Sequence, residues 1–465
     1  MKNTALLGIL AVLVLEAGCV MGPKYKRPTV DVPQEYRAPA PQEASQASSL
    51  GNEQWWQVYQ DPVLTQLIHT AIATNYDVRI AAARVLEAQA QVGITRSNQF
   101  PSASVGADIF SQQNARVTKL FPAYQVNGGE LNLSVIWNLD FWGKYRRQSE
   151  AARAQLLATE WGQRAVISSL VANVATAYFQ LRALDSELEI SKSTLASRQQ
   201  SLQLTQFLEN HGSGSGLDVS QAEQLVYTAS ETIPDLERQI QQQENMLSVL
   251  LGENPQSVPR GRALTEQPVP QNVPPGLPSE LLERRPDVRQ AEENVVAANA
   301  QIGVAKAAFF PNLSLTGLGG LESNALHQFI SQPSEVWSGA FSVSQPVFQG
   351  GALRSQLRLS RANWQETVFS YQQTVQNALE QVSNSVVASQ KDREFREQQE
   401  LLTQAAQHTD QLSEVLYKNG GASYLQVLTS ETNYFSAEVN LVQAQLNERL
   451  ALVQLYQALG GGWQQ

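Results

Sequence analysis

Two long segments of this chain, residues 75–251 and 285–459, are copies of one pattern. Asp77-Val78-Arg79 recurs as Asp287-Val288-Arg289, at an offset of about 210 residues. A duplication of so long a period constrains architecture, because each copy must fold into the same order of elements. In each copy the pattern predicts a helix, two alternating strands, a very long helix, a glycine-rich turn and a return helix.

The amino-terminus has the pattern of an export signal. Residues 1–18 combine a positive Lys2, an apolar stretch and a small-residue cleavage site, so they are expected to be a signal peptide. Cys19, just after that site, is typical of a bacterial lipoprotein whose thiol receives lipid, although Glu16 stands where Leu is usual. Ordinary cleavage with an unmodified thiol is the alternative. No later run of 18 apolar residues exists, so a membrane crossing would have to be a closed β-barrel.

Strand patterns follow the first helix of each copy. From Leu131 to Phe141 apolar and polar residues alternate over about 10 residues, enough to cross a bilayer when tilted. We expect one β-hairpin at about 101–143 and a less regular one at about 311–350, where Pro346 should force a bulge. A soluble β-sandwich with one solvent-exposed face is the alternative for these strands.

Two very long helices are predicted, at about Lys144–Glu209 and Gly351–Tyr417. At 1.5 Å per residue each would reach roughly 100 Å, too long for a globular core. Apolar residues recur in steps of three and four in the first, which is a coiled-coil seam interrupted by Ser191 and Arg198. In each copy, the combined length of the short helix before the hairpin and the return helix nearly equals that of one long helix. We therefore expect these two helices to stack end to end.

These patterns give a domain plan. A lipidated extended tether is expected at 19–60, the first repeat at 61–251 with a long helical hairpin at about 144–251, and the second repeat at 278–465 with its helical hairpin at about 351–460. The proline-rich crossover, 252–277, is expected to lack regular structure and to wrap the outside of the body.

Closure of the strands requires several chains. Four tilted strands cannot close a barrel, and membrane barrels start at eight. Two chains would give eight strands and three would give twelve. Small residues on the expected inner face favour three chains and an open lumen; they are Ser102, Ser104, Gly106, Ser342 and Ser344. The expected fold class is an α+β membrane protein with four strands per chain in a closed β-barrel, continued by long coiled-coil helices. Three chains would make it a trimeric 12-stranded β-barrel.

Composition and residue spacing argue against several functions. A net charge of −10 and a pI near 5.1 oppose nucleic-acid binding. One cysteine and four isolated histidines offer no metal site, and we find no catalytic set, so neither an enzyme nor a cofactor is expected.

A family resemblance rests on several motifs: Cys19-Val20-Met21-Gly22-Pro23-Lys24-Tyr25, Trp55-Trp56, Asp61-Pro62, Arg284-Arg285-Pro286-Asp287-Val288-Arg289, Phe309-Phe310-Pro311 and Tyr456-Gln457-Ala458-Leu459-Gly460-Gly461-Gly462-Trp463. The chain resembles the TolC/OprM-type outer-membrane efflux channels, in the NodT-like lipoprotein branch, over essentially the whole mature chain. The resemblance implies a homotrimer with a twelve-helix α-barrel in the periplasm. It also implies a passive duct for small molecules such as drugs, served by an inner-membrane RND pump and a periplasmic adaptor. Val20 after the lipidated cysteine fits delivery to the outer membrane.

The resemblance also implies a constriction at the periplasmic end, made by acidic and aromatic residues near the hairpin tips. The matching residues are Tyr424, Gln426, Thr429 and Glu431 in the second copy, and Asp218 and Glu223 in the first. Relatives usually carry Asp at Gln426, Thr429 or both, so this sequence departs from the family there. Asp218 is equally explained as a carboxylate in the first turn of a helix, and Tyr424 as helix packing.

The hairpin tips themselves are expected to dock on the adaptor, because they are the tight turns at the far end of the long helices. Their residues are Gly212, Ser213, Gly214, Leu217, Gly420, Gly421, Ser423 and Leu425. Turn geometry alone is the alternative. For the whole chain, the alternatives are a type I secretion duct of the same fold, a coiled-coil surface lipoprotein without a pore, and a lipoprotein enzyme.

Overall fold

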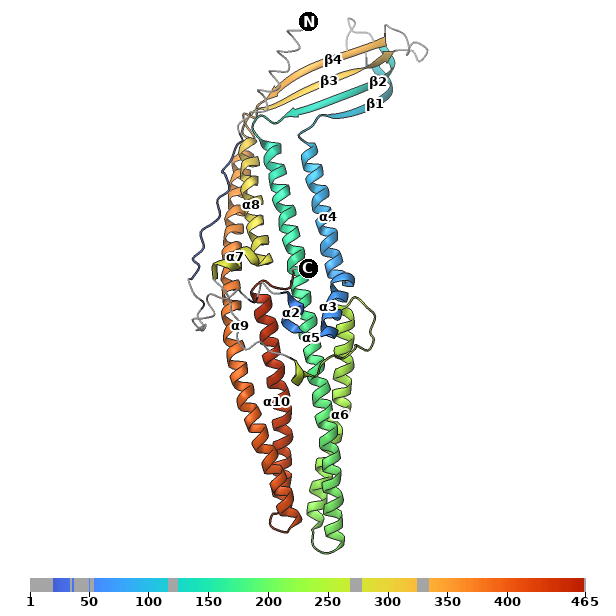
Figure 1. The fold of residues 1–465 in the computed structure, drawn as a ribbon. Coiled ribbons are helices and arrows are strands. Elements are labelled where there is room, and N and C mark those ends of the chain that lie inside the picture. Colours follow the sequence, from blue (N-terminus) through green and yellow to red (C-terminus); the bar gives the residue numbers. More distant parts are fainter. Residues whose placement is uncertain are drawn as a thin grey trace. The chain divides into compact units, whose positions relative to one another are not determined.

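The computed structural model describes residues 20–33, 36, 50, 54–115, 124–267, 278–323 and 334–463 (Figure 1). The expected signal peptide and Cys19 lie outside these residues. The chain divides into two compact units: unit 1 is Met1–Thr29, Arg84–Glu160 and Gln290–Tyr371, and unit 2 is Val30–Ala83, Trp161–Arg289 and Gln372–Gln465.

Unit 1 contains one four-stranded antiparallel sheet in the order β1-β2-β3-β4. The strands are β1 (Ser102–Asn114), β2 (Tyr124–Leu139), β3 (Asn312–Ser323) and β4 (Glu335–Ser344). Both copies of the repeat therefore contribute one hairpin to the same sheet, and the expectation of four strands per chain is confirmed. The predicted bulge at Pro346 is wrong, because β4 ends at Ser344 and the proline follows the strand.

The register of the sheet separates two faces. Val105 pairs with Leu133, and Leu315 pairs with Phe341, so apolar side chains share one face across the strands. Ser104 pairs with Ser134 on the other face. The apolar face is open in the single chain, with Ile109 83% exposed and Phe341 60% exposed.

The helices repeat the same lengths in the two copies. The long ones are α5 (Lys144–Asn210) and α9 (Ala352–Lys418), of 67 residues each. The return helices α6 (Gly216–Leu250) and α10 (Tyr424–Ala458) have 35 residues each, and α4 (Tyr76–Ser97) and α8 (Pro286–Ala307) have 22. Shorter elements are α2 (Trp55–Tyr59), α3 (Pro62–Thr74), η3 (Leu264–Glu266), η4 (Pro278–Glu280) and α7 (Leu281–Arg284).

The short helices meet end to end in unit 2, as predicted. Asn75, just before α4, donates its amide to the Leu250 carbonyl at the end of α6, at 2.9 Å. In the second copy, Arg285 before α8 donates to the Ala458 carbonyl at the end of α10, also at 2.9 Å. These bonds satisfy carbonyls that a helix end would otherwise leave without partners. The same junction is thus built twice with different side chains.

The crossover between the copies is more ordered than expected. Leu264 of η3 is fully buried, and Gln267 donates to the Asp61 carboxylate at 2.6 Å. From the second copy, Arg449 donates to the Gln267 carbonyl at 2.9 Å. The prediction that this segment lacks regular structure and stays outside is wrong for its described part, because buried polar contacts hold it. The expected tether likewise ends in a helical turn, α2.

An extended amino-terminal segment lies against α8 in unit 1. Arg147 donates to the carbonyls of Met21 at 3.0 Å and Pro23 at 3.1 Å. A Cβ on Gly22 would come within 2.5 Å of the Gly303 Cα, so the backbones touch there and only glycine fits. The segment just after Cys19 is therefore held by specific contacts.

Candidate functional site

The first hairpin tip is a tight turn that ends in a capped helix. Gly212 has a φ of 73°, in the left-handed region that favours glycine, and the N–H of Gly214 donates to the Leu208 carbonyl at 3.0 Å. Ser215 then caps α6. The Asp218 N–H donates to the Ser215 Oγ at 3.3 Å, and the Ser215 N–H donates to the Asp218 carboxylate at 3.2 Å. This capping box gives Asp218 a role in starting the helix.

The second tip has the same turn but a weaker cap. Gly420 has a φ of 74°, and the Gly421 N–H donates to the Leu416 carbonyl at 2.8 Å. Ser423 stands at the cap position of α10, and its side chain makes no capping hydrogen bond within the described structure. The side chains of Ser213, Leu217, Ser423 and Leu425 are exposed at the two tips.

Tyr424 lies in helix packing behind the second tip. Its side chain is only 2% exposed, and its ring centroid is 5.4 Å from that of Tyr417 on α9. Ala222 of α6 and Leu202 of α5 belong to the same apolar cluster. Burial raises the pKa of the Tyr424 phenol, and Glu431 adds to the rise. Four helices of one chain therefore meet around this ring.

Further along α10, a group of buried polar residues joins three helices. Arg198 of α5 is 3% exposed, donates to the Leu225 carbonyl of α6 at 3.0 Å, and lies 5.4 Å from the Phe435 ring centroid. Glu431 accepts a hydrogen bond from Ser201 at 2.8 Å. Burial raises the pKa of Glu431, which the Ser201 hydrogen bond partly offsets, and burial lowers the pKa of Arg198.

The structure thus brings together some of the residues predicted for the constriction. Tyr424 and Glu431 share one buried neighbourhood, and Asp218 is near enough to raise the pKa of Tyr424 slightly. Glu223 is half-buried, whereas Gln426 and Thr429 are exposed on another face of α10. Sequence reasoning did not assign Arg198 and Ser201 to this site. The interruption of the apolar seam at Arg198 was the available signal.

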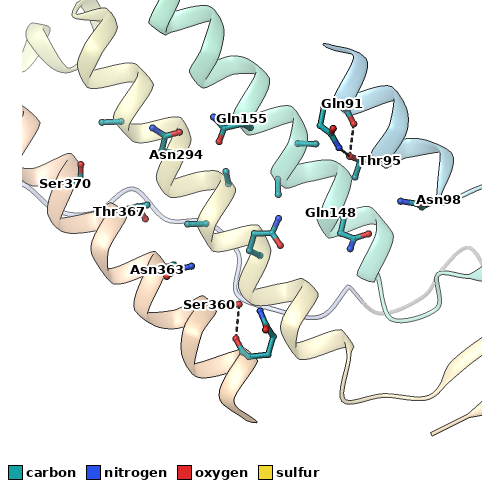
Figure 2. Close-up of a pocket in the computed structure, with 17 residues that line it drawn as sticks. Gln91, Thr95, Asn98, Gln148, Gln155, Asn294, Ser360, Asn363, Thr367 and Ser370 are labelled. Atoms are coloured by element: carbon teal, nitrogen blue, oxygen red, sulfur yellow. Dashed lines mark hydrogen bonds between the residues drawn. The ribbon is translucent and has the colours of Figure 1, made fainter. Parts of the chain in front are cut away.

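Unit 1 contains a large polar cavity between α4, α5, α8 and α9, of about 830 Å³ (Figure 2). The labelled side chains are amides and hydroxyls, among them Gln91 of α4, Gln155 of α5, Asn294 of α8 and Asn363 of α9. The 17 lining residues carry no formal charge. This wall offers hydrogen-bond donors and acceptors but no formal charge.

No helix among the described residues has the length and hydropathy of a membrane span. No three side chains of His, Cys, Asp or Glu come close enough together there to hold a metal ion.

Comparison with known proteins gives the family. The family model for outer membrane efflux proteins matches residues 67–253 and again residues 277–461. The chain belongs to the outer membrane efflux protein family. The family model thus matches once in each copy of the repeat, and the resemblance drawn from the sequence motifs is confirmed. As a member of this family, the chain is an outer-membrane efflux protein.

Individual relatives cover the full length. The chain is 32% identical over 453 residues to the cation efflux system protein CusC of Escherichia coli O6:H1, covering 96% of each chain. It is 31% identical to the probable outer membrane lipoprotein SilC of Salmonella typhimurium, covering all of both. Among solved structures, the outer-membrane channel OprN matches with a TM-score of 0.89 and 31% identity, over 96% of this chain and 100% of that one.

Proposed function

We propose that three copies of this chain form the passive outer-membrane exit duct of a tripartite efflux system for small molecules. The observation that carries the proposal is the apolar face of the sheet. It is exposed in the single chain, with Trp337 at 86% and Val105 at 73%. An apolar patch of this kind on strands of bilayer length suits contact with lipid rather than water.

The edges of the sheet favour closure between copies. β1 and β4 are the two edge strands, so each offers backbone groups to a strand of a neighbouring copy. Three sheets joined in this way would make a twelve-stranded barrel. The face bearing Ser104, Ser134 and Ser342 would then line a polar lumen.

An exposed seam on α9 supports helical contact between copies. Phe395, Leu402 and Leu416 recur at multiples of seven residues, and each is 51–58% exposed; Leu412 lies on the same stripe and is 50% exposed. A heptad seam needs a partner helix, and a neighbouring copy would supply one. Twelve helices from three copies would continue the barrel as a tube, with the neutral cavity of Figure 2 in its wall.

Partners follow from the tripartite arrangement. An inner-membrane RND pump would supply the energy, and a periplasmic adaptor would contact the exposed tips at Gly212–Leu217 and Gly420–Leu425. The resting constriction would lie just behind these tips, with Asp218, Tyr424 and Glu431 as its principal residues. Glu223, Gln426 and Thr429 would be subsidiary to them.

We also propose that Cys19 carries lipid after removal of residues 1–18. The relative SilC is named an outer membrane lipoprotein. In this chain the Met21 N–H donates at 3.1 Å to the carbonyl of Trp142, three residues beyond β2. That contact holds the start of the mature chain beside the sheet, where an anchor could enter the same membrane.

We propose the same domain boundaries as the sequence predicts. The two repeats span 61–251 and 278–465, and the crossover 252–277 joins them.

The test is the state of the purified protein. Light scattering in a neutral detergent should give a protein mass three times that of one chain, and planar bilayers should show ion-conducting channels. A monodisperse monomer in detergent-free buffer, without channel activity, would contradict the proposal.

A further inference from the structure

A second cavity, of about 500 Å³, lies within unit 2 between α5, α6 and α10. Three carboxylates line it: Glu187 from α5 and Glu231 and Asp235 from α6. Phe435 of α10 supplies an aromatic wall. The cavity is therefore acidic on two helices and apolar on the third.

Ser191 interrupts the apolar coiled-coil seam of α5 at this cavity. It lines the cavity and is 2% exposed. No hydrogen bond joins its hydroxyl to another residue of the described part of the chain. Buried hydroxyls are normally hydrogen-bonded, so an unpartnered one facing a cavity points to a polar occupant.

Pro234 lies inside α6, between the lining residues Glu231 and Asp235. Proline has no N–H, so the hydrogen bond to the Ser230 carbonyl is lost and the ring crowds that carbonyl. Glu231 and Asp235 lie on either side of this break. The break in α6 thus coincides with the break in the seam of α5.

The carboxylates differ in how they are compensated. Asp235 forms an ion pair with Arg238 and accepts a hydrogen bond from Gln239 at 2.7 Å. Glu187 and Glu231 have neither an ion pair nor a side-chain hydrogen bond among the described residues. Glu187 is half-buried, and burial raises the pKa of its carboxyl. An uncompensated carboxylate in such a place costs stability that a bound cation would restore.

We propose that this cavity binds a small organic cation, an amine, amidine or guanidine on a flat apolar body. Glu187 and Glu231 would hold the charge, and the Ser191 hydroxyl would accept a hydrogen bond from the cation. The body would lie against Phe435 and Leu236. The volume suits a molecule of this size, and the Phe435 ring, which lies 5.4 Å from the Arg198 guanidinium, offers apolar surface to the flat body. The site goes beyond the duct, since it lies within one chain and needs neither pump nor adaptor.

The experiment titrates the purified full-length protein, in neutral detergent, with the fluorescent diamidine 4′,6-diamidino-2-phenylindole. The wild type should bind saturably with one site per chain. Glu187→Gln should weaken binding at least about tenfold, the loss expected for one charge-assisted hydrogen bond. Glu189→Gln, an exposed α5 carboxylate outside the cavity, is the matched control and should change the dissociation constant less than about twofold.

A second variant keeps the test independent of folding. Ser191→Leu completes the apolar seam and fills the cavity, so it should abolish binding while the helical circular dichroism spectrum is retained. The proposal is overturned if the wild type shows no saturable binding. It is also overturned if Glu187→Gln and Ser191→Leu bind like the wild type, or if Glu189→Gln loses as much affinity as Glu187→Gln.

Discussion

Asp61 shows how one side chain can join distant parts of the sequence. Its buried carboxylate accepts hydrogen bonds from the Val63 N–H at 2.8 Å, the Tyr178 hydroxyl at 2.9 Å and the Gln267 amide at 2.6 Å. Burial acts to raise the pKa of Asp61, but these hydrogen bonds outweigh it and lower the pKa. The ionised form therefore stabilises the contact between α3, α5 and the crossover.

Replacing this carboxylate should destabilise the chain in a pH-dependent way. The depressed folded pKa means that the charge contributes stability above the unfolded pKa of about 3.9, and that this is lost as the pH falls through the folded value. Asp61→Asn should cost about 2 kcal/mol at pH 7, and less near pH 3, in denaturant unfolding followed by circular dichroism. Asp77→Asn, at the exposed start of α4, is the control; an equal loss there would contradict the role of Asp61.

Replacing the single residue Asp218 tests the proposed constriction. Three copies of one carboxylate in a narrow pore favour cations. Asp218→Asn should lower the cation preference in planar bilayers, whereas Gln426→Asp, at an exposed position of the same tip region, should raise it. If Asp218→Asn keeps the reversal potential and conductance of the wild type, Asp218 only caps the helix together with Ser215. The constriction would then be assigned to Tyr424.

At the scale of elements, sequence periodicity located the regular structure well. The predicted end of the first long helix was Glu209, and α5 ends at Asn210. The alternation of apolar and polar residues identified four strands, and the duplication assigned them to two hairpins. A helix of one turn is too short to show a periodic pattern of apolar residues, so the sequence did not predict η3 or α2. Periodicity also marked Arg198 only as a break in a seam, because its partners, Leu225 and Phe435, come from other helices and depend on tertiary packing.

The hairpin tips make a prediction about docking. Ser213→Trp and Ser423→Trp place bulk on exposed turn residues and leave every glycine intact. Each should reduce site-specific cross-linking of the adaptor at least severalfold, because the partner's backbone could no longer approach the turn closely. Ser193→Trp, on an exposed face of α5 away from the tips, should have no effect. Normal trimers with undiminished cross-linking in both tip variants would refute docking there.

At the scale of the whole molecule, assembly should depend on the α9 seam. Leu402→Lys with Leu412→Lys would place two charges in the contact between copies and leave the core of each chain untouched, since both residues are exposed. The proposed trimer of this variant should then dissociate at a lower detergent concentration than that of the wild type, measured by light scattering. Gln404→Lys, exposed and off the seam, is the control; equal stability of all three proteins would exclude this interface.

The proposed lipid anchor should contribute less to membrane insertion than the sheet. The anchor enters the membrane at one residue of each chain, whereas the apolar face of the sheet extends over four strands. The intact mass of the native protein should show lipid on Cys19, and Cys19→Ser should still yield trimers in the outer membrane fraction. An unmodified mass would disprove the first statement, and loss of membrane trimers would disprove the second.

The unequal caps of the two tips have a consequence for motion. Ser215 and Asp218 bond reciprocally at the start of α6, whereas the Ser423 side chain makes no capping bond at the start of α10. A missing cap costs a helix about 1 kcal/mol, so the first turn of α10 should unwind about five times as often as that of α6. Around a threefold axis, loose and firm turns would then alternate. Deuterium uptake at the Gln426 and Asp218 amides, which donate to the Ser423 and Ser215 carbonyls, would reveal which of the two turns opens first.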